Sequence, residues 1–243
     1  MGTRTAFAAA SLAALFAAGD AAAQLYVKLD SGYSWAWNAN VTDDQPTSPD
    51  CVLQPASGTV CNGVLNELKS SFIIGAGVGY RFPGGFRADI TYGYRGGYDL
   101  SGCDPAGSCF DPKVSSNSLM ANGYYELPVS LADGRVKPFV GGGIGSSRNE
   151  MNNLQWRDAG QSGTLPGGRK TQFAWQVTLG ADVRLHDAWV LEVGYRYSEF
   201  GKFNKEAGTG SGVPFNANNF TTQLTGKLRA NELIVNLRYD FPR

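Results

Sequence analysis

Few residues of this chain could do chemistry, and their spacing argues against a catalytic or metal site. The 243 residues include a single histidine, His186, and four cysteines. The cysteines form two close pairs, Cys51 with Cys61 and Cys103 with Cys109, and neither pair has the C-x2-C spacing that zinc sites commonly use. We therefore expect no catalytic residue, no bound metal and no cofactor, and the protein is predicted not to be an enzyme.

A glycine-rich run, residues 141–147 (GGGIGSS), could suggest a phosphate-binding loop. Such a loop ends in Gly-Lys-Ser/Thr and opens a helix, because backbone amides and the lysine hold the phosphates. This run has no such ending and precedes no helical pattern. We interpret it as part of a glycine-rich strand.

The N-terminus predicts export. Arg4 is followed by a short apolar run, residues 6–18, and then by three alanines, residues 21–23, which offer a cleavage site before Gln24. The run is shorter than the roughly 20 apolar residues that a transmembrane helix needs. The alternative is an N-terminal core helix. We expect residues 1–23 to be a signal peptide and residues 24–243 to form one domain, with no helical membrane span.

Export to an oxidising compartment makes disulfides the expected use of the cysteines. Four cysteines allow three pairings. Each close pair lies within one polar connection, so we expect near-neighbour bridges, Cys51–Cys61 and Cys103–Cys109. Each bridge would tie down one loop and contribute up to about 3 kcal/mol by the chain-entropy argument.

The elements that position the remaining polar residues are strands, because apolar side chains recur at every second position. The clearest case is the end of the chain, where one face carries Leu233, Val235, Leu237, Tyr239 and Phe241. The opposite face is mainly charged or amide. Eight segments follow this kind of pattern, at residues 24–37, 70–82, 86–98, 117–129, 136–147, 171–184, 189–200 and 230–241.

These segments are joined alternately by long and short connections, which would place every long connection at one end. Together with 32 glycines, 12% aromatic residues and only 17% charged residues, this predicts an all-β fold, an eight-stranded antiparallel up-and-down transmembrane β-barrel. Lysine plus arginine equals aspartate plus glutamate, at 21 each, so no net field points to a nucleic-acid partner.

The alternation predicts which side chains face lipid and which face the lumen. The lipid-facing set on the last two strands is Leu191, Val193, Tyr195, Leu233, Val235 and Leu237. The lumen would receive seven basic and seven acidic side chains: Lys28, Asp30, Arg81, Arg87, Asp89, Arg95, Glu126, Asp182, Arg184, Glu192, Arg196, Glu232, Arg238 and Asp240. Eight strands leave an interior that side chains just fill, which favours a salt-bridged plug. An ion pathway or proton relay is the alternative.

A soluble, lipocalin-like barrel would reverse this facing, with the apolar side chains inside. Aromatic residues near both ends of the apolar band favour lipid instead, because membrane interfaces select them there. Trp35, Tyr80, Phe86 and Trp189 are examples.

Two stretches carry a resemblance, residues 137–145 (KPFVGGGIG) and 191–197 (LEVGYRY). With the N-terminal segment and the aromatic last strand, the chain resembles the small outer-membrane β-barrel family of Gram-negative bacteria. This family includes the OmpA membrane domain, opacity-type surface antigens and porin-family proteins. The resemblance implies location in the cell outer membrane, with membrane lipid, lipopolysaccharide and the barrel assembly machinery as partners.

The expected function is therefore a non-enzymatic outer-membrane barrel, structural or porin-like, with four long surface loops. The alternative is a surface adhesin or antigen that binds anionic glycans, lipopolysaccharide, or a host or matrix ligand through basic loops. The third and fourth loops carry the basic residues Arg148, Arg157, Arg169, Lys170, Lys202, Lys205, Lys227 and Arg229. A lipid-modifying hydrolase would need a histidine near the outer leaflet, whereas His186 lies in a short turn at the other end.

Overall fold

The structure, a computed structural model, describes most of the chain. The described residues are 23–37, 42–43, 68–99, 102–103, 109–110, 112–158, 161–205, 208–209, 211–212, 220–221 and 224–242. The predicted signal peptide, except residue 23, and the pair Cys51 and Cys61 lie outside them. Among the described residues, no helix has the length and apolar character that crossing a membrane would require.

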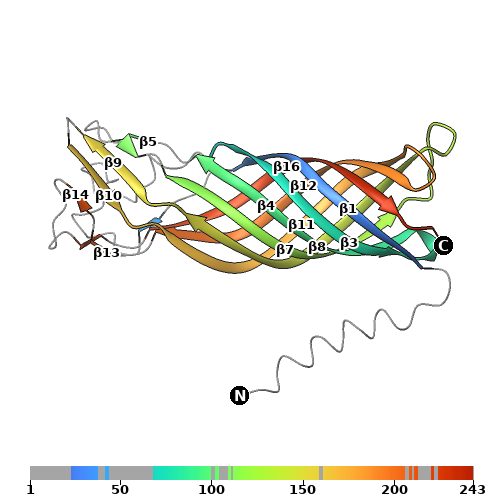
Figure 1. The fold of residues 1–243 in the computed structure, drawn as a ribbon, viewed down its shortest axis with the longest axis horizontal. Helices are drawn as coiled ribbons and strands as arrows, with labels where there is room; N and C mark the ends of the chain where they lie inside the picture. Colours follow the sequence, from blue (N-terminus) through green and yellow to red (C-terminus); the bar gives the residue numbers. More distant parts are fainter. Residues whose placement is uncertain are drawn as a thin grey trace, which may run out of the picture.

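Eight long strands form a closed antiparallel barrel, as predicted (Figure 1). Each strand pairs with the next, and β1 closes the barrel by pairing with β16 from Tyr26↔Asp240 to Ala36↔Ala230. The strands are β1 (Gln24–Ala36), β3 (Ser70–Arg81), β4 (Phe86–Asp99), β7 (Lys113–Glu126), β8 (Val136–Met151), β11 (Gly168–Arg184), β12 (Trp189–Lys205) and β16 (Leu224–Asp240).

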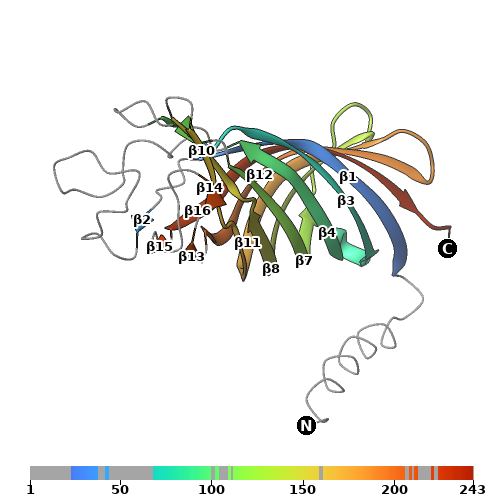
Figure 2. The same ribbon diagram turned by 60° about the vertical axis from the view of Figure 1, so that its left-hand side comes forward.

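Three tight connections lie at one end of the barrel, together with the start of β1 and the end of β16 (Figures 1 and 2). The first is a single 3-10 turn, Pro83–Gly85, in which Gly84 has a φ of +80° that favours glycine. The second contains the predicted Asp133-Gly134 turn, where both residues have positive φ. The third is the turn at His186, as expected. We call this the short-turn end, and the opposite end the loop end.

Short strands pair with one another beyond the loop end (Figure 2). β9 (Leu154–Asp158) and β10 (Gln161–Leu165) form a hairpin within residues 148–170, which were predicted as a loop. β6 (Cys109–Phe110) joins the edge of β9, and β5 (Gly102–Cys103) and β14 (Ser211–Gly212) complete a five-stranded sheet. β2 (Thr42–Asp43) pairs with β16, and β13 (Gly208–Thr209) pairs with β15 (Phe220–Thr221). Three different connections therefore share one small sheet.

The barrel strands also run further toward the loop end than the sequence predicted, to Met151 in β8 and Lys205 in β12. Two of these extensions contain a β-bulge with a glycine of positive φ. Gly97 lies in the bulge of β4, and Gly201 lies in the bulge of β12. A bulge inserts one residue and changes which side chains face inward beyond it.

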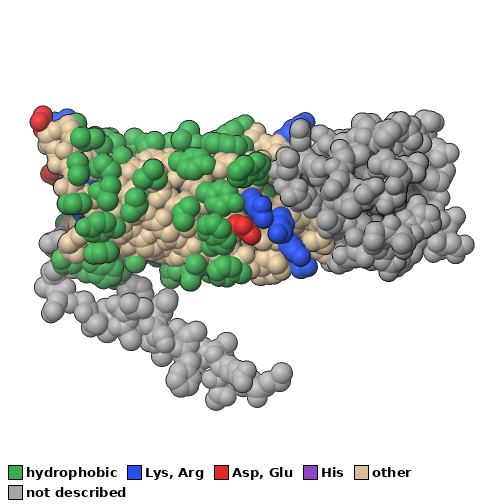
Figure 3. Space-filling model, turned by 180° about the vertical axis from the view of Figure 1, so that it is seen from behind, with side chains coloured by type: hydrophobic (Ala, Val, Ile, Leu, Met, Phe, Trp, Pro, Cys, Tyr) green, Lys and Arg blue, Asp and Glu red, His purple; other side chains and the backbone are tan. Residues whose placement is uncertain are grey.

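The outer wall of the barrel is apolar (Figure 3). Of the side chains predicted to face lipid, Val193, Tyr195, Leu233, Val235 and Leu237 are exposed, and Leu191 is half-buried. The apolar side chains of the wall point outward and are exposed, whereas the buried side chains point inward. The core of this molecule therefore lies inside the barrel.

Candidate functional site: the filled lumen

The structure brings most of the predicted charged residues together inside the barrel. Twelve of the fourteen are buried, and all twelve lie on barrel strands. Arg81 is partly exposed, with 19% of its side chain accessible. Arg184 is exposed and lines a small cavity at the short-turn mouth. Strand alternation places these side chains inside, since each lumen-facing position stands opposite another on the neighbouring strand.

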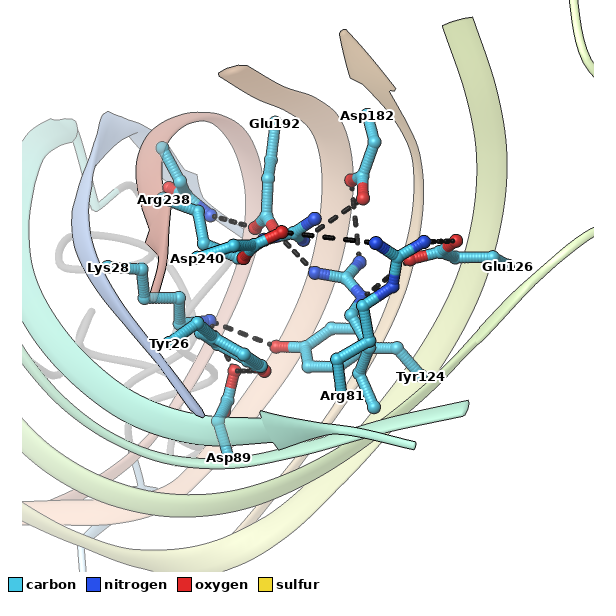
Figure 4. A network of polar contacts seen from close by, with 12 residues as sticks. Tyr26, Lys28, Arg81, Asp89, Tyr124, Glu126, Asp182, Glu192, Arg238 and Asp240 are labelled. Carbon is cyan, nitrogen blue, oxygen red and sulfur yellow. Dashed lines mark hydrogen bonds and ion pairs between the residues drawn. The ribbon is translucent and has the colours of Figure 1, made fainter. Parts of the chain in front are cut away.

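A network of arginines and carboxylates fills the lumen near the short turns (Figure 4). Arg87 and Arg238 both contact Glu192, and Asp182 lies 3.4 Å from Arg87 and 3.0 Å from Arg238. Asp182 and Glu192 stand directly opposite each other in the β11–β12 ladder. Like charges in that position repel, so Arg87, reaching across the lumen from β4, and Arg238, from the neighbouring β16, stabilise the pair. We call Arg81, Arg87, Glu126, Asp182, Glu192, Arg238 and Asp240 the arginine network.

Lys28 lies in the middle of the lumen and is held by oxygen atoms. Its Nζ is 2.9 Å from Asp89 and 3.2 Å from the hydroxyl of Tyr124. Tyr26 donates a hydrogen bond of 3.0 Å to the same Asp89 carboxylate, and Asn122 donates another of 2.7 Å. A buried ammonium and carboxylate are stable only with such additional partners. These contacts fix Lys28 as a structural cation.

Glu232 is the centre of a second ionic group, closer to the loop end. It accepts hydrogen bonds from Arg95 Nε at 2.6 Å and Arg196 Nε at 2.5 Å. Ser34 and Ser198 also donate to its carboxylate. Glu232 is fully buried, and it balances two guanidinium groups from opposite sides of the lumen. Charge-assisted hydrogen bonds of this kind are the strong ones in proteins.

Above Glu232 large apolar side chains join the buried polar ones in the lumen, which the sequence reasoning missed. The Phe200 ring lies 4.0 Å from the Arg95 guanidinium, and Phe200 and Phe203 are both fully buried. The carbonyl oxygens of Phe200 and Lys202 accept hydrogen bonds from Asn149 at 2.7 and 3.1 Å. The β12 bulge is therefore anchored to β8. We name the buried apolar side chains at this level the apolar plug: Tyr98, Val114, Met151, Phe200, Phe203 and Leu228.

Small cavities remain between the charged groups. One of about 10 Å³ lies at the short-turn mouth, and another of about 10 Å³ lies beside Asp30 and Arg196. A water molecule needs about this volume. One Asp30 oxygen accepts no hydrogen bond from the described residues, so a single water there would satisfy it. Side chains with a few waters therefore account for the filling of the described lumen.

The predicted cysteine pair 103 and 109 falls on two strands of the small sheet. Cys103 and Cys109 stand opposite each other in the β5–β6 ladder. Within the described part of the chain, no group of three or more histidine, cysteine or acidic side chains is arranged to hold a metal ion.

Known proteins match both the sequence and the fold. A family model described as an outer membrane protein β-barrel domain matches residues 5–241. Outer membrane protein PagN of Salmonella typhimurium is 26% identical over 188 residues, or 72% of this chain and 75% of PagN. A putative adhesin of Rickettsia conorii, RC1281, is 26% identical over 191 residues, or 74% of this chain and 72% of the adhesin. OprG of Pseudomonas aeruginosa shares the fold, with a TM-score of 0.52 at 12% identity over 90% of this chain and 96% of OprG.

Proposed function

The chain belongs to the outer membrane protein β-barrel family, and from this premise we propose that it is a non-enzymatic scaffold whose lumen is closed. In this proposal residues 1–23 are a signal peptide, and residues 24–243 form a barrel that the barrel assembly machinery inserts into the outer membrane. The short-turn end faces the periplasm, and the long connections form four surface loops.

The observation that carries the proposal is the filled lumen. Twelve charged side chains are buried there, in the arginine network, around Lys28 and around Glu232. An unpaired buried charge costs several kcal/mol, so an open ion path would have to break several pairs at once. The apolar plug adds a second obstacle, because an ion crossing it would lose its hydration. These features support a structural role over a porin-like one.

Conductance in a planar bilayer tests the closed lumen. The full chain, refolded in detergent, should first show heat-modifiable migration on a gel, as a closed barrel does. We then expect no steady conductance after incorporation. A reproducible single-channel current from heat-modifiable protein would show a porin-like function and reject the scaffold.

A second candidate function is a surface adhesin or antigen that binds anionic glycans or lipopolysaccharide. The name of the Rickettsia relative, a putative adhesin, supports it. The basic residues predicted for the third and fourth loops lie mainly on the loop ends of β8, β11, β12 and β16, where those with exposed side chains offer a positive surface. Retention on immobilised heparin is the test, and adhesion of this kind requires retention that decreases with salt. If the folded barrel passes through the column at low ionic strength, this candidate loses its physical basis.

The cysteine bridges are proposed as part of the surface loops. A bridge between Cys103 and Cys109 fits their opposite positions in the β5–β6 ladder. It would secure the edge of the small sheet that joins three connections. Mass spectrometry of tryptic peptides without reduction should find residues 103 and 109 linked, and separately residues 51 and 61.

A further inference from the structure

Basic side chains gather on one side of the outer wall, just beyond the apolar band (Figure 3). They come from four neighbouring strands, β8, β11, β12 and β16, near their loop ends. All five are at least partly accessible and alternate with inward-facing neighbours. We call them the cationic patch: Arg148, Arg169, Lys202, Lys227 and Arg229.

Aromatic residues on the same strands show where the cationic patch lies relative to the membrane. Tyr195 donates a hydrogen bond to Asn231, and the Trp175 and Tyr197 rings lie 5.5 Å apart. Aromatic residues of this kind mark the membrane interface in barrels. The next outward pair along the ladder is Glu199 and Arg229. The patch therefore lies where lipid headgroups meet the outer wall.

Two charges of the patch have no ion-pair partner among the described residues. Lys202 and Lys227 stand directly opposite each other in the β12–β16 ladder, and both side chains are exposed. Like charges in this position destabilise a sheet. Neither lysine forms an ion pair with a described residue. An anion bound between them would relieve the repulsion.

Two carboxylates nearby reduce the positive charge of the cationic patch only in part. Arg229 lies 3.4 Å from Glu199, and Arg169 lies 3.9 Å from Glu150. The strands beside the patch differ, because Lys113 on β7 is balanced by Asp99 on β4 at 3.4 Å. Among the described residues near the loop end, unbalanced positive charge is therefore concentrated in the patch.

A hollow beside the patch offers space for a polar group. It has a volume of about 600 Å³ and lies between the ends of β8 and β11, with Glu150 and Arg169 in its lining. Asn153 accepts a hydrogen bond from the Gly167 amide and holds the two chain segments together. The hollow is open and polar, and it shares Arg169 with the cationic patch.

We propose that the cationic patch binds the phosphate groups of an anionic glycolipid of the outer leaflet. The acyl chains of this lipid lie on the apolar wall at Phe173 and Leu233, and a sugar of its headgroup enters the hollow beside Arg169. The patch continues directly from the apolar wall, which favours a membrane lipid over a soluble glycan. This proposal deepens the proposed function and depends on it, since it requires the barrel to lie in the outer membrane.

Two double variants of the full chain test the proposal in dodecylphosphocholine micelles. K202E/K227E reverses two charges of the patch, and K69E/K113E reverses two exposed lysines outside it, one just before β3 and one on β7. Each is titrated with lipid A, a phosphorylated glycolipid, and the bound fraction is counted by native mass spectrometry. We expect K202E/K227E to bind at least about tenfold more weakly than the wild type, because each basic residue at an anionic lipid surface adds to binding. K69E/K113E should bind like the wild type.

A parallel titration with dephosphorylated lipid A should show little binding to the wild type. Equal affinity for the two lipids, or equal loss in both double variants, would overturn the proposal. So would the binding of heparin, and not lipid A, in a patch-dependent way, since that result identifies a glycan site. Failure of the proposed function is seen separately, as a steady conductance or as wild-type protein that is soluble without detergent.

Discussion

The two ends of the lumen are filled by different means on the same strands. Near the short turns, the arginine network fills the space with paired charges, and its outermost member, Arg81, is accessible from the mouth, as is the neighbouring Arg184. Near the loop end, the apolar plug is almost fully buried. The comparison indicates that water can approach the network from one side only. The barrel is thus closed from the outside by packing and held from within by ion pairs.

The largest loss of stability should come from removing the buried charge of Glu232, which has the most partners in its ionic group. Glu232→Gln removes the charge that balances Arg95 and Arg196, and both guanidinium groups stay buried. Removing one partner of a buried ion pair costs about 3–5 kcal/mol. Urea unfolding in lipid bilayers should show this loss in the free energy of unfolding.

Glu199→Gln is the control for that variant. Its ion pair with Arg229 lies on the outer wall, with side chains about 30% accessible on both partners. Pairs this exposed contribute at most about 1 kcal/mol. Equal losses for the two variants would mean that the lumen is no drier than the surface, which contradicts the comparison.

Truncating a side chain of the apolar plug should lower the free energy of unfolding by a somewhat smaller amount. Phe203→Ala empties a fully buried position, and the expected loss is about 3 kcal/mol, at the lower end for such changes. Phe173→Ala, where the ring is 65% exposed on the outer wall, should cost less. Bilayer recordings of a Phe200→Ala, Phe203→Ala double variant would sharpen the comparison. Brief openings in that variant and silence in Glu232→Gln would place the seal in the plug.

A glycine under the plug offers a finer test of its packing. A side chain added at Gly226 would meet the Phe203 ring, with the Cε1 atom 2.9 Å from the new Cβ. Gly226→Ala should therefore destabilise the barrel by about 1–3 kcal/mol. Gly123→Ala is the matched control, because nothing lies within 4 Å of its new Cβ. Thermal unfolding of the two variants in detergent should differ, and equal melting temperatures would show a loose plug.

The smallest effect is expected outside the lumen, at the level of the plug. Lys227→Glu places opposite charges across the ladder from each other, so it should stabilise the barrel by about 0.2–1 kcal/mol in neutral detergent. Chemical unfolding in that detergent measures the gain. A loss comparable to that of Phe203→Ala would mean that the outer wall and the plug are not separate regions.

The sequence predicted the membrane-facing part of the fold well and the loop end poorly. The eight strands were found because outward apolar residues alternate with inward polar ones, as at Val193 and Glu192. Beyond the apolar band the outward residues become polar, as at Arg148 and Lys202, so the period-two signal disappears although the ladder continues. The β9–β10 hairpin was missed for the same reason, and the pairing of separate connections is a long-range effect.

Two residues of the plug were missed because two bulges change the facing of the chain. Simple alternation from Tyr94 would place Tyr98 outside, and alternation from Tyr197 would place Phe203 outside. Both side chains are fully buried, since each lies at or beyond a bulge with a glycine of positive φ, Gly97 or Gly201. A bulge cannot be recognised from hydrophobic periodicity alone, because it is the break in that periodicity.

The bulge at Gly201 has a consequence for how the surface of such a protein can change. It turns Phe203 inward while β12 is still hydrogen-bonded to β16. The seal of the lumen is therefore built from residues of the barrel strands and not from the connections beyond them. The surface connections can therefore be lengthened, shortened or exchanged during evolution while the lumen stays closed.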